Sequence, residues 1–310
     1  MRVVFMGTPK LSQGVLEILQ AQENLDIVVV YTNKDSVSKR GKSLTPSPVK
    51  SFATSHNIEV QTPDTLKSED VLSTLYAYKP DFICVAAYGK LLPKAVLECP
   101  KYECLNVHGS LLPKWRGAAP IERSILGGDT QTGVSIMRME AGLDTGPYCI
   151  QKSFDIVDRD ISYVQRKMIE CGGYGLIEAM DLIANNNVKW KFQDESYVTY
   201  AEKLSKRELF LTYDMSYIEA YRCVLASSDA HKCKCIIADR GVNVLQACIV
   251  EQDFDYGVGD VIIENGHLYL CFKDGILQVL SLKPDGKGEM SAKSFVAGLS
   301  KNKSFTWQSF

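Results

Sequence analysis

The sequence predicts an α/β protein in which a doubly wound, mostly parallel sheet is followed by a small β-barrel of the OB type. In the first half of the chain, short apolar runs alternate with segments whose apolar residues recur at helical spacing, which is typical of a parallel sheet with crossover helices. In the last third, short β-rich runs are separated by turn signals such as Asn265-Gly266 and Asp274-Gly275, which is typical of a barrel.

Six strands are expected in the first half, each a short apolar run, at residues 2–6, 27–32, 58–60, 81–87, 104–107 and 132–138. Helical spacing occurs from Leu11 to Leu19, within 66–78, after Pro120 and across 162–187. The loop after the first strand, Gly7-Thr8-Pro9-Lys10, lacks the glycine spacing that admits a dinucleotide pyrophosphate, and Pro9 obstructs the tight turn. A nicotinamide or flavin cofactor is therefore not expected.

The second half of the chain changes character. From Trp190 to about Leu211 it is polar and weakly periodic, which favours a linker. One helix is expected at 215–226, and five strands follow at 233–238, 242–250, 260–264, 267–273 and 276–282. The predicted organisation is a catalytic domain at 1–189, a linker at 190–208 and a barrel domain at 209–310.

Composition limits the class of protein. The 310 residues favour two domains, and 45% hydrophobic with 23% charged residues is ordinary for a globular chain. A net charge of −2 does not by itself indicate a nucleic-acid partner, so RNA binding must rest on local patches. The apolar run after Met1 ends at Gly7, too short for a signal peptide, and nothing approaches the roughly 18 apolar residues of a membrane span. We expect a cytoplasmic monomer with no membrane partner.

Ten cysteines are scattered singly through apolar stretches, which indicates reduced, mostly buried thiols. The segment His231-Lys232-Cys233-Lys234-Cys235 offers three soft ligands but lacks the CxxC spacing of a structural zinc site. It is interpreted as a strand with two inward cysteines, and no metal is expected.

Polar side chains gather where the strand at 104–107 ends. In an open α/β sheet, ligands bind beyond the carboxyl ends of strands. Asn106 and His108 are two residues apart and so point the same way on an extended strand, with His108 near solvent at the strand end. An amide donor and an imidazole that face one spot suit stabilisation of an oxyanion together with proton transfer.

A second loop, Gly142-Leu143-Asp144-Thr145-Gly146-Pro147, adds a carboxylate between glycines that permit tight turns near a ligand. Asp144 is placed to hold His108 charged or to accept a proton through water. Taken singly, each residue also has a structural interpretation, in which Asn106 and His108 cap a strand end and Asp144 is a turn residue.

The string NVHGSLLPKWRGAAPI (106–121), followed by GLDTG (142–146), resembles the folate-dependent formyltransferases, whose catalytic Asn, His and Asp fall at Asn106, His108 and Asp144. Three further segments are similar to the methionyl-tRNA formyltransferases within that family: SKRGKSLTPSPVK (38–50), VTYAEKLSK (198–206) and PDGKGEMSAKSF (284–295). The resemblance covers nearly the whole chain, and it implies that the barrel domain binds tRNA.

The activity that this resemblance implies is transfer of a formyl group, without a metal, from 10-formyltetrahydrofolate to the methionine of initiator methionyl-tRNA, giving formylmethionyl-tRNA for translation initiation. Asn106 and a protonated His108 would stabilise the oxyanion of a tetrahedral intermediate. Asp144 would set the state of His108 and help to move the proton.

The resemblance also implies ligand contacts. Folate would contact Ser110, Leu111, Leu112 and Pro113, and its pterin would lie against the loop formed by Tyr88, Gly89, Lys90, Leu91 and Leu92. For the second loop, a helix entry before Pro93 is the alternative. Lys39, Arg40 and Lys42 would meet tRNA phosphates and a base, with a solvated charged loop as the alternative.

The barrel departs from the family pattern at Ser227-Ser228-Asp229-Ala230-His231-Lys232, where many members carry a Trp-Pro segment, so its tRNA contacts are left undefined. Two other functions stay open. A formyltransferase acting on a nucleotide-linked amino sugar or a purine precursor would share Asn106, His108 and Asp144. A non-catalytic folate- or RNA-binding protein has no reason to keep these three residues together.

Overall fold

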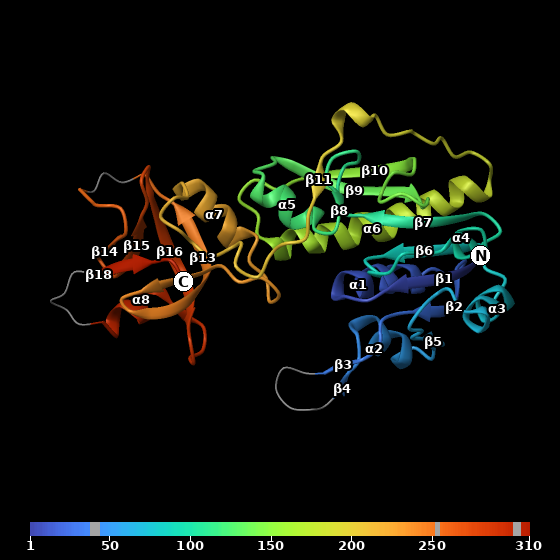
Figure 1. Ribbon diagram of the computed structural model, residues 1–310, viewed down its shortest axis with the longest axis horizontal. Coiled ribbons are helices and arrows are strands. Elements are labelled where there is room, and N and C mark those ends of the chain that lie inside the picture. The colour runs from blue at the N-terminus through green and yellow to red at the C-terminus, as the bar shows by residue number, and fades with distance from the viewer. Residues whose placement is uncertain (38–43, 252–254, 300–304) are drawn as a thin grey trace. The chain divides into compact units, whose positions relative to one another are not determined.

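The computed structural model describes residues 1–37, 44–251, 255–299 and 305–310 (Figure 1). Lys39, Arg40 and Lys42, the predicted tRNA contacts, lie outside the described residues. The chain forms two compact units, one made of Met1–Ile121, Gln131–Asp155 and Gln165–Glu202, the other of Glu122–Thr130, Ile156–Val164 and Lys203–Phe310. Within the described ranges, no helix combines the length and the apolar character needed to cross a membrane.

The first unit is built on a seven-stranded sheet with the order β10-β9-β7-β6-β1-β2-β5. Its strands are β1 (Arg2–Gly7), β2 (Asp26–Tyr31), β5 (Val60–Gln61), β6 (Phe82–Ala86), β7 (Glu103–His108), β9 (Gln131–Arg138) and β10 (Tyr148–Asp155). Strands β5, β2, β1, β6 and β7 run parallel to one another. Strand β9 is antiparallel to both of its neighbours, β7 and β10. The predicted mostly parallel, doubly wound sheet is confirmed. The edge strand β10 was missed because its residues alternate between half-buried and exposed, so no continuous apolar run marks it.

Strand β7 lies inside the sheet and is fixed on both sides. Asn106 pairs with Val85 of β6 and with Met137 of β9, and His108 pairs with Ser135. Hydrogen bonds to two neighbours set the register of the strand, and a shift of one residue would turn every side chain to the other face. The hydrogen bonds of β7 to β6 and β9 therefore determine the face of the sheet on which the Asn106 and His108 side chains lie.

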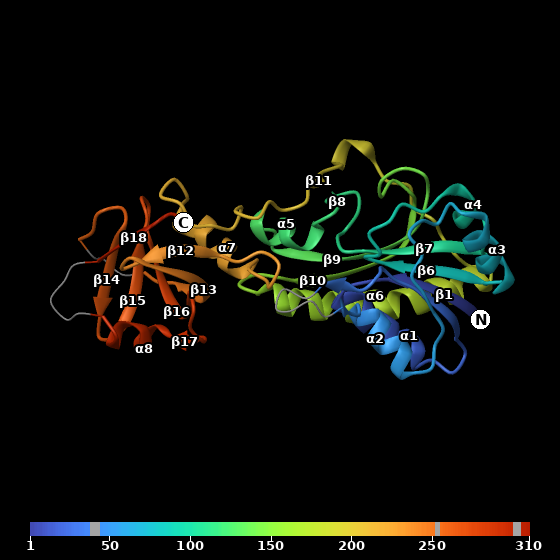
Figure 2. The ribbon, with the colours of Figure 1, turned by 60° about the horizontal axis from the view of Figure 1, so that its bottom comes forward.

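Helices cover both faces of the sheet (Figure 2). They are α1 (Lys10–Gln20), α2 (Pro48–Ser55), α3 (Glu69–Ala77), α4 (Lys94–Leu97) and α6 (Ile161–Ala184). A further helix, α5 (Pro120–Leu126), belongs mostly to the second unit. Helix α6 approaches β7 so closely that a Cβ on Gly172 would lie 2.7 Å from Cγ1 of Val107, which only glycine permits. On the other face, Ile83, Val85 and Cys104 belong to a core cluster that includes Leu75 of α3 and Val96 of α4.

The segment 190–201, named the strap here, lies within the region that the sequence favours as a linker. Its residues form the short 3-10 helix η1 (Glu195–Tyr197) and the strand β11 (Tyr200–Ala201), which pairs in parallel with β8 (Arg116–Gly117). A second small sheet joins β3 (Ser36–Val37) to β4 (Leu44–Thr45). The strap belongs to the first unit, where the pairing of β11 with β8 places it alongside the loop after β7.

The second unit contains a closed six-stranded barrel. Its strands are β12 (Lys234–Ile237), β13 (Arg240–Ile249), β14 (Asp260–Glu264), β15 (His267–Cys271), β16 (Ile276–Pro284) and β18 (Phe305–Gln308), with β17 (Met290–Ser291) attached to β16. Pairing of β13 with β16 closes the ring. Helices α7 (Tyr217–Leu225) and α8 (Ala292–Ala297) belong to the same unit.

The predicted barrel is confirmed, but its predicted number of strands was wrong. Strand β18 lies between β12 and β14, and its four residues include one fully buried side chain, Trp307. The indole of Trp307 packs on Phe272 and donates a hydrogen bond to the carbonyl of Cys271 at 3.0 Å. A strand with only one inward-facing apolar residue has too weak an alternating pattern to be recognised from its own sequence.

The two cysteines expected to point inward, Cys233 and Cys235, are both fully buried. Burial raises the pKa of both thiols, because the apolar surroundings disfavour a thiolate. In the part of the chain that the structure describes, no group of three or more His, Cys, Asp or Glu side chains is arranged to hold a metal ion.

Candidate active site

Asn106 and His108 lie at the carboxyl end of β7, as the sequence predicts. The Asn106 side chain is half-buried, and its amide has no hydrogen-bond partner among the described residues. His108 is only 4% exposed, so the expectation that it lies near solvent was wrong. The loop after β7 folds back over the imidazole, and His108 Nε2 donates a hydrogen bond to the carbonyl of Trp115 at 2.9 Å.

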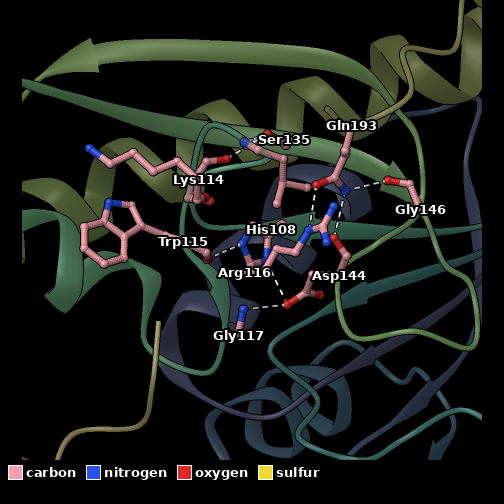
Figure 3. A network of polar contacts seen from close by, with 11 residues as sticks. His108, Lys114, Trp115, Arg116, Gly117, Ser135, Asp144, Gly146 and Gln193 are labelled. Atoms are coloured by element: carbon pink, nitrogen blue, oxygen red, sulfur yellow. Dashed lines mark hydrogen bonds and ion pairs between the residues drawn. The ribbon is translucent and has the colours of Figure 1, made fainter. Parts of the chain in front are cut away.

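The Asp144 loop meets this strand end (Figure 3). Asp144 has a left-handed backbone with φ of 52° and a side chain that is 16% exposed. Its Oδ2 accepts a hydrogen bond from the backbone N–H of Gly117 at 2.9 Å and lies 3.6 Å from Nδ1 of His108. The fold therefore brings the predicted His108 and Asp144 together as a pair, with His108 buried and Asp144 half-buried.

Burial lowers the pKa of His108 below its ordinary value of 6.5, and the positive charge of Arg116 acts in the same direction. The Asp144 carboxylate and the hydrogen bond to Trp115 oppose this, but burial is the larger effect. The imidazole is therefore neutral at pH 7 in this structure. Its proton is on Nε2, because that nitrogen faces a carbonyl, which only accepts. This differs from the protonated His108 that the resemblance implies.

Sequence reasoning missed a buried arginine beside the pair. Arg116 is 1% exposed, and its Nε donates to Oε1 of Gln193 at 2.9 Å. Its two terminal nitrogens donate to the Glu195 carboxylate at 2.8 and 3.2 Å, so the buried charge is compensated. Gln193 in turn donates to the carbonyls of Asp144 and Gly146, both at 2.8 Å. Nothing in the aperiodic sequence of the strap signals these contacts.

The loop predicted to contact folate is held by Ser135 of β9. Ser135 Oγ donates to the Ser110 carbonyl at 2.7 Å and accepts from the Leu112 N–H at 3.0 Å. Gln151 of β10 donates to the Leu112 carbonyl at 2.8 Å, and the Leu112–Pro113 peptide bond is cis. Ser110 and Leu112 are thus buried and fixed, while Leu111 and Pro113 are half-buried beside them.

The predicted pterin loop has one buried and one exposed end. Tyr88 is 2% exposed and belongs to the core cluster, whereas Leu91 is 87% exposed. Gly89 has φ of 79°, a conformation that favours glycine, and Lys90 Nζ donates to the Pro63 carbonyl at 2.5 Å. Leu92 is half-buried against the core, and α4 begins two residues later, so the loop is also a helix entry.

A mostly parallel sheet whose strand end carries Asn106 and His108, faced by an aspartate loop and followed in the chain by a closed barrel, defines the formyl transferase class of fold. Residues 1–180 match the family described as Formyl transferase, and residues 203–300 match the Formyl transferase C-terminal domain. The chain belongs to the formyl transferase family.

Several solved structures are similar to this chain in fold. HypX from Aquifex aeolicus, in complex with tetrahydrofolic acid, superposes with a TM-score of 0.63 at 15% identity, covering 99% of this chain and 50% of that one. The sugar 3N-formyl transferase WlaRD gives 0.60 at 16%, with coverages of 93% and 99%. The methionyl-tRNA formyltransferase from Clostridium thermocellum gives 0.57 at 12%, with coverages of 81% and 94%.

The chain spans about half the length of the HypX proteins that it matches. At these identities the similarity shows the fold. By their names, WlaRD and the Clostridium thermocellum protein differ in the acceptor of the formyl group, so the acceptor of this chain has to be argued from its own residues.

Proposed function

We propose that this chain is a methionyl-tRNA formyltransferase, which moves a formyl group from 10-formyltetrahydrofolate to the amino group of methionine on initiator tRNA. The observation that carries the formyl-transfer part of this proposal is the His108–Asp144 pair, 3.6 Å apart, at the strand end where the Asn106 amide has no hydrogen-bond partner among the described residues. A half-buried amide without a partner is a ready donor for an oxygen that gains charge.

The chemistry needs an oxyanion site and a proton path. Attack of the amine on the formyl carbon places negative charge on the formyl oxygen, and the Asn106 amide donates to that oxygen. Because the amide makes no competing hydrogen bond to a described residue, it needs no reorganisation before the reaction.

The attacking nitrogen must lose a proton and the leaving folate nitrogen must gain one. His108 Nδ1 carries no proton in the neutral ring, so it accepts the amine proton, and Asp144 stabilises the imidazolium that forms. Nδ1 then donates the same proton to the leaving nitrogen, which returns His108 to its neutral form.

The loops at 110–113 and 88–92 are assigned to folate. Ser135 and Gln151 hold the first loop rigidly, which suits a binding surface that should not pay ordering entropy. In the second loop the exposed Leu91 offers apolar surface beside a glycine with positive φ. These two features support the assignment.

The tRNA acceptor is supported by three segments, 38–50, 198–206 and 284–295, which resemble the methionyl-tRNA formyltransferases. An amino-sugar acceptor is the second candidate, because WlaRD covers this chain over 93% of its length. The test is to supply 10-formyltetrahydrofolate with charged initiator tRNA, a dTDP-linked amino sugar or a free small amine. Formylation of tRNA alone is expected, and transfer only to the sugar would overturn the tRNA proposal.

The pH dependence of turnover follows from the pKa of His108. Because burial lowers that pKa below 6.5, the neutral form that accepts the amine proton persists as the pH falls to 6.5. We therefore expect the acid-side midpoint of the turnover number at saturating substrates to lie below pH 6.5, the ordinary pKa of histidine. An NMR titration of the His108 ring should give a pKa in the same acid range. A ring pKa above 6.5 would contradict the neutral-base assignment.

Arg40→Ala is expected to impair the use of charged tRNA while leaving folate affinity nearly unchanged. The residue lies in a basic, aperiodic segment, and phosphate contacts release condensed counterions, so wild-type tRNA affinity should also weaken as salt rises. Formylation of tRNA and binding of tetrahydrofolate are measured for both proteins across a salt series. Equal activity on tRNA at every salt concentration would show that 38–43 is an ordinary solvated loop.

A further inference from the structure

We infer that Gln193 is a positioning residue of the transfer site, which holds Asp144 at its working distance from His108 by tying the Asp144 loop to the buried Arg116. The effect on turnover that we infer rests on the proposed function, whereas the effect on the Asp144 loop does not. Gln193 itself touches neither His108 nor the Asp144 carboxylate in any contact of this network, so it acts through other groups (Figure 3).

One side-chain amide makes three hydrogen bonds here. Its oxygen accepts from Nε of Arg116 at 2.9 Å, and its nitrogen donates to the carbonyls of Asp144 and Gly146 at 2.8 Å each. An amide nitrogen has two protons, so both donors are used and both are directed at the same loop. A group with this arrangement fixes a loop conformation rather than merely filling space.

The Asp144 loop needs such a tether. Asp144 adopts a left-handed backbone, which is disfavoured for a residue with a side chain, and both residues that precede it, Gly142 and Leu143, are exposed. The Gly117 N–H holds the carboxylate but not the backbone. Gln193 supplies the backbone restraint, because it binds the carbonyls on either side of Thr145.

Attachment of the strap does not require Gln193. Thr199 accepts from the N–H groups of both Trp115 and Arg116 at 2.9 Å, and β11 pairs with β8 at Gly117. Glu195 separately binds both terminal nitrogens of Arg116. Removing the Gln193 amide should therefore leave the strap in place and release only the Asp144 loop.

The test compares Gln193→Met, which keeps the length of the side chain but loses all three hydrogen bonds, with Ser196→Ala as a matched control. Ser196 is exposed in the same strap, and among the described residues its hydroxyl hydrogen-bonds only to Asp194. We expect Gln193→Met to lower the turnover number by roughly tenfold to a hundredfold with folate affinity unchanged, because small misplacement of reacting groups costs rate rather than binding. Ser196→Ala should match the wild type in both.

A readout without catalysis uses the amide of Gly117, whose proton is bound by the Asp144 carboxylate. Its exchange with solvent should be about tenfold faster in Gln193→Met and unchanged in Ser196→Ala. Gln193→Glu, which keeps the acceptor for Arg116 but loses both donors to the loop, should behave like Gln193→Met and guards against a variant that fails to fold.

A double variant separates positioning from general structural support. If Gln193 acts through Asp144, adding Gln193→Met to Asp144→Asn should lower turnover by less than twofold more. Losses that multiply, or an unchanged Gly117 exchange rate, would overturn the inference. A wild-type protein that transfers formyl to no acceptor would instead refute the proposed function, while the exchange measurement would still decide the role of Gln193.

Discussion

His108→Ala is expected to lower the turnover number by about a hundredfold or more, because it removes the group that accepts the amine proton. At 1.36 kcal/mol per tenfold, this is about 2.7 kcal/mol of transition-state stabilisation. Folate affinity should survive, since the loop at 110–113 is held by Ser135 and not by His108. Single-turnover formyl transfer and tetrahydrofolate titration measure the two quantities.

Because His108 is buried, the alanine variant also loses packing and its hydrogen bond to the Trp115 carbonyl. That bond contributes roughly 1 kcal/mol to the free energy of unfolding. His108→Gln fills more of the space and serves as the control for stability. If the alanine variant is folded and turns over like the wild type with unchanged folate affinity, the assignment of His108 to the chemical step is wrong.

Asp144→Asn is expected to cause a comparable loss of turnover with little loss of stability. The substitution keeps the size of the side chain and an oxygen that accepts from the Gly117 N–H, but removes the charge that stabilises the His108 imidazolium. The pKa of His108 should fall further in this variant, because the attraction that raises it is gone. An NMR titration of the imidazole beside the turnover measurement tests both effects.

His108 and Asp144 should act as a unit. Groups that handle one proton are strongly non-additive, so the double variant His108→Ala with Asp144→Asn should be little worse than the poorer single variant. Losses that simply multiply would show that the 3.6 Å pair does not share one function.

Local pattern predicted most of the first unit. The apolar runs placed four of the five parallel strands, because buried strands of a parallel sheet are apolar on both faces and so stand out in a sequence. The fifth, β5, is a half-buried edge strand that overlaps the predicted 58–60 only at Val60. The edge strand β10 has one covered face and half-buried residues, and β18 has one inward tryptophan. Both were missed because their burial depends on partners that lie elsewhere in the chain.

The pair of His108 and Asp144 was predictable because strand ends and glycine-flanked loops have short sequence signatures. The protonation state of His108 was not predictable from the sequence. Its low pKa comes from burial beneath residues 115–117 and from the nearby Arg116, and a sequence does not show which loop folds over which side chain.

The sequence by itself determined the class of fold and the order of most of its elements, because periodicity is a local property of the chain, and its motifs singled out His108 and Asp144 as candidates. Only the tertiary structure decided the protonation of His108, the place of β18 between β12 and β14 in the barrel, and the network through Arg116. Arg116 and Gln193 are 77 residues apart, and a hydrogen bond over that separation exists only when both segments are already packed. The periodicity of a sequence shows which face of a helix or strand is buried. It does not show which other segment covers that face, and the contacts in the candidate site depend on that segment.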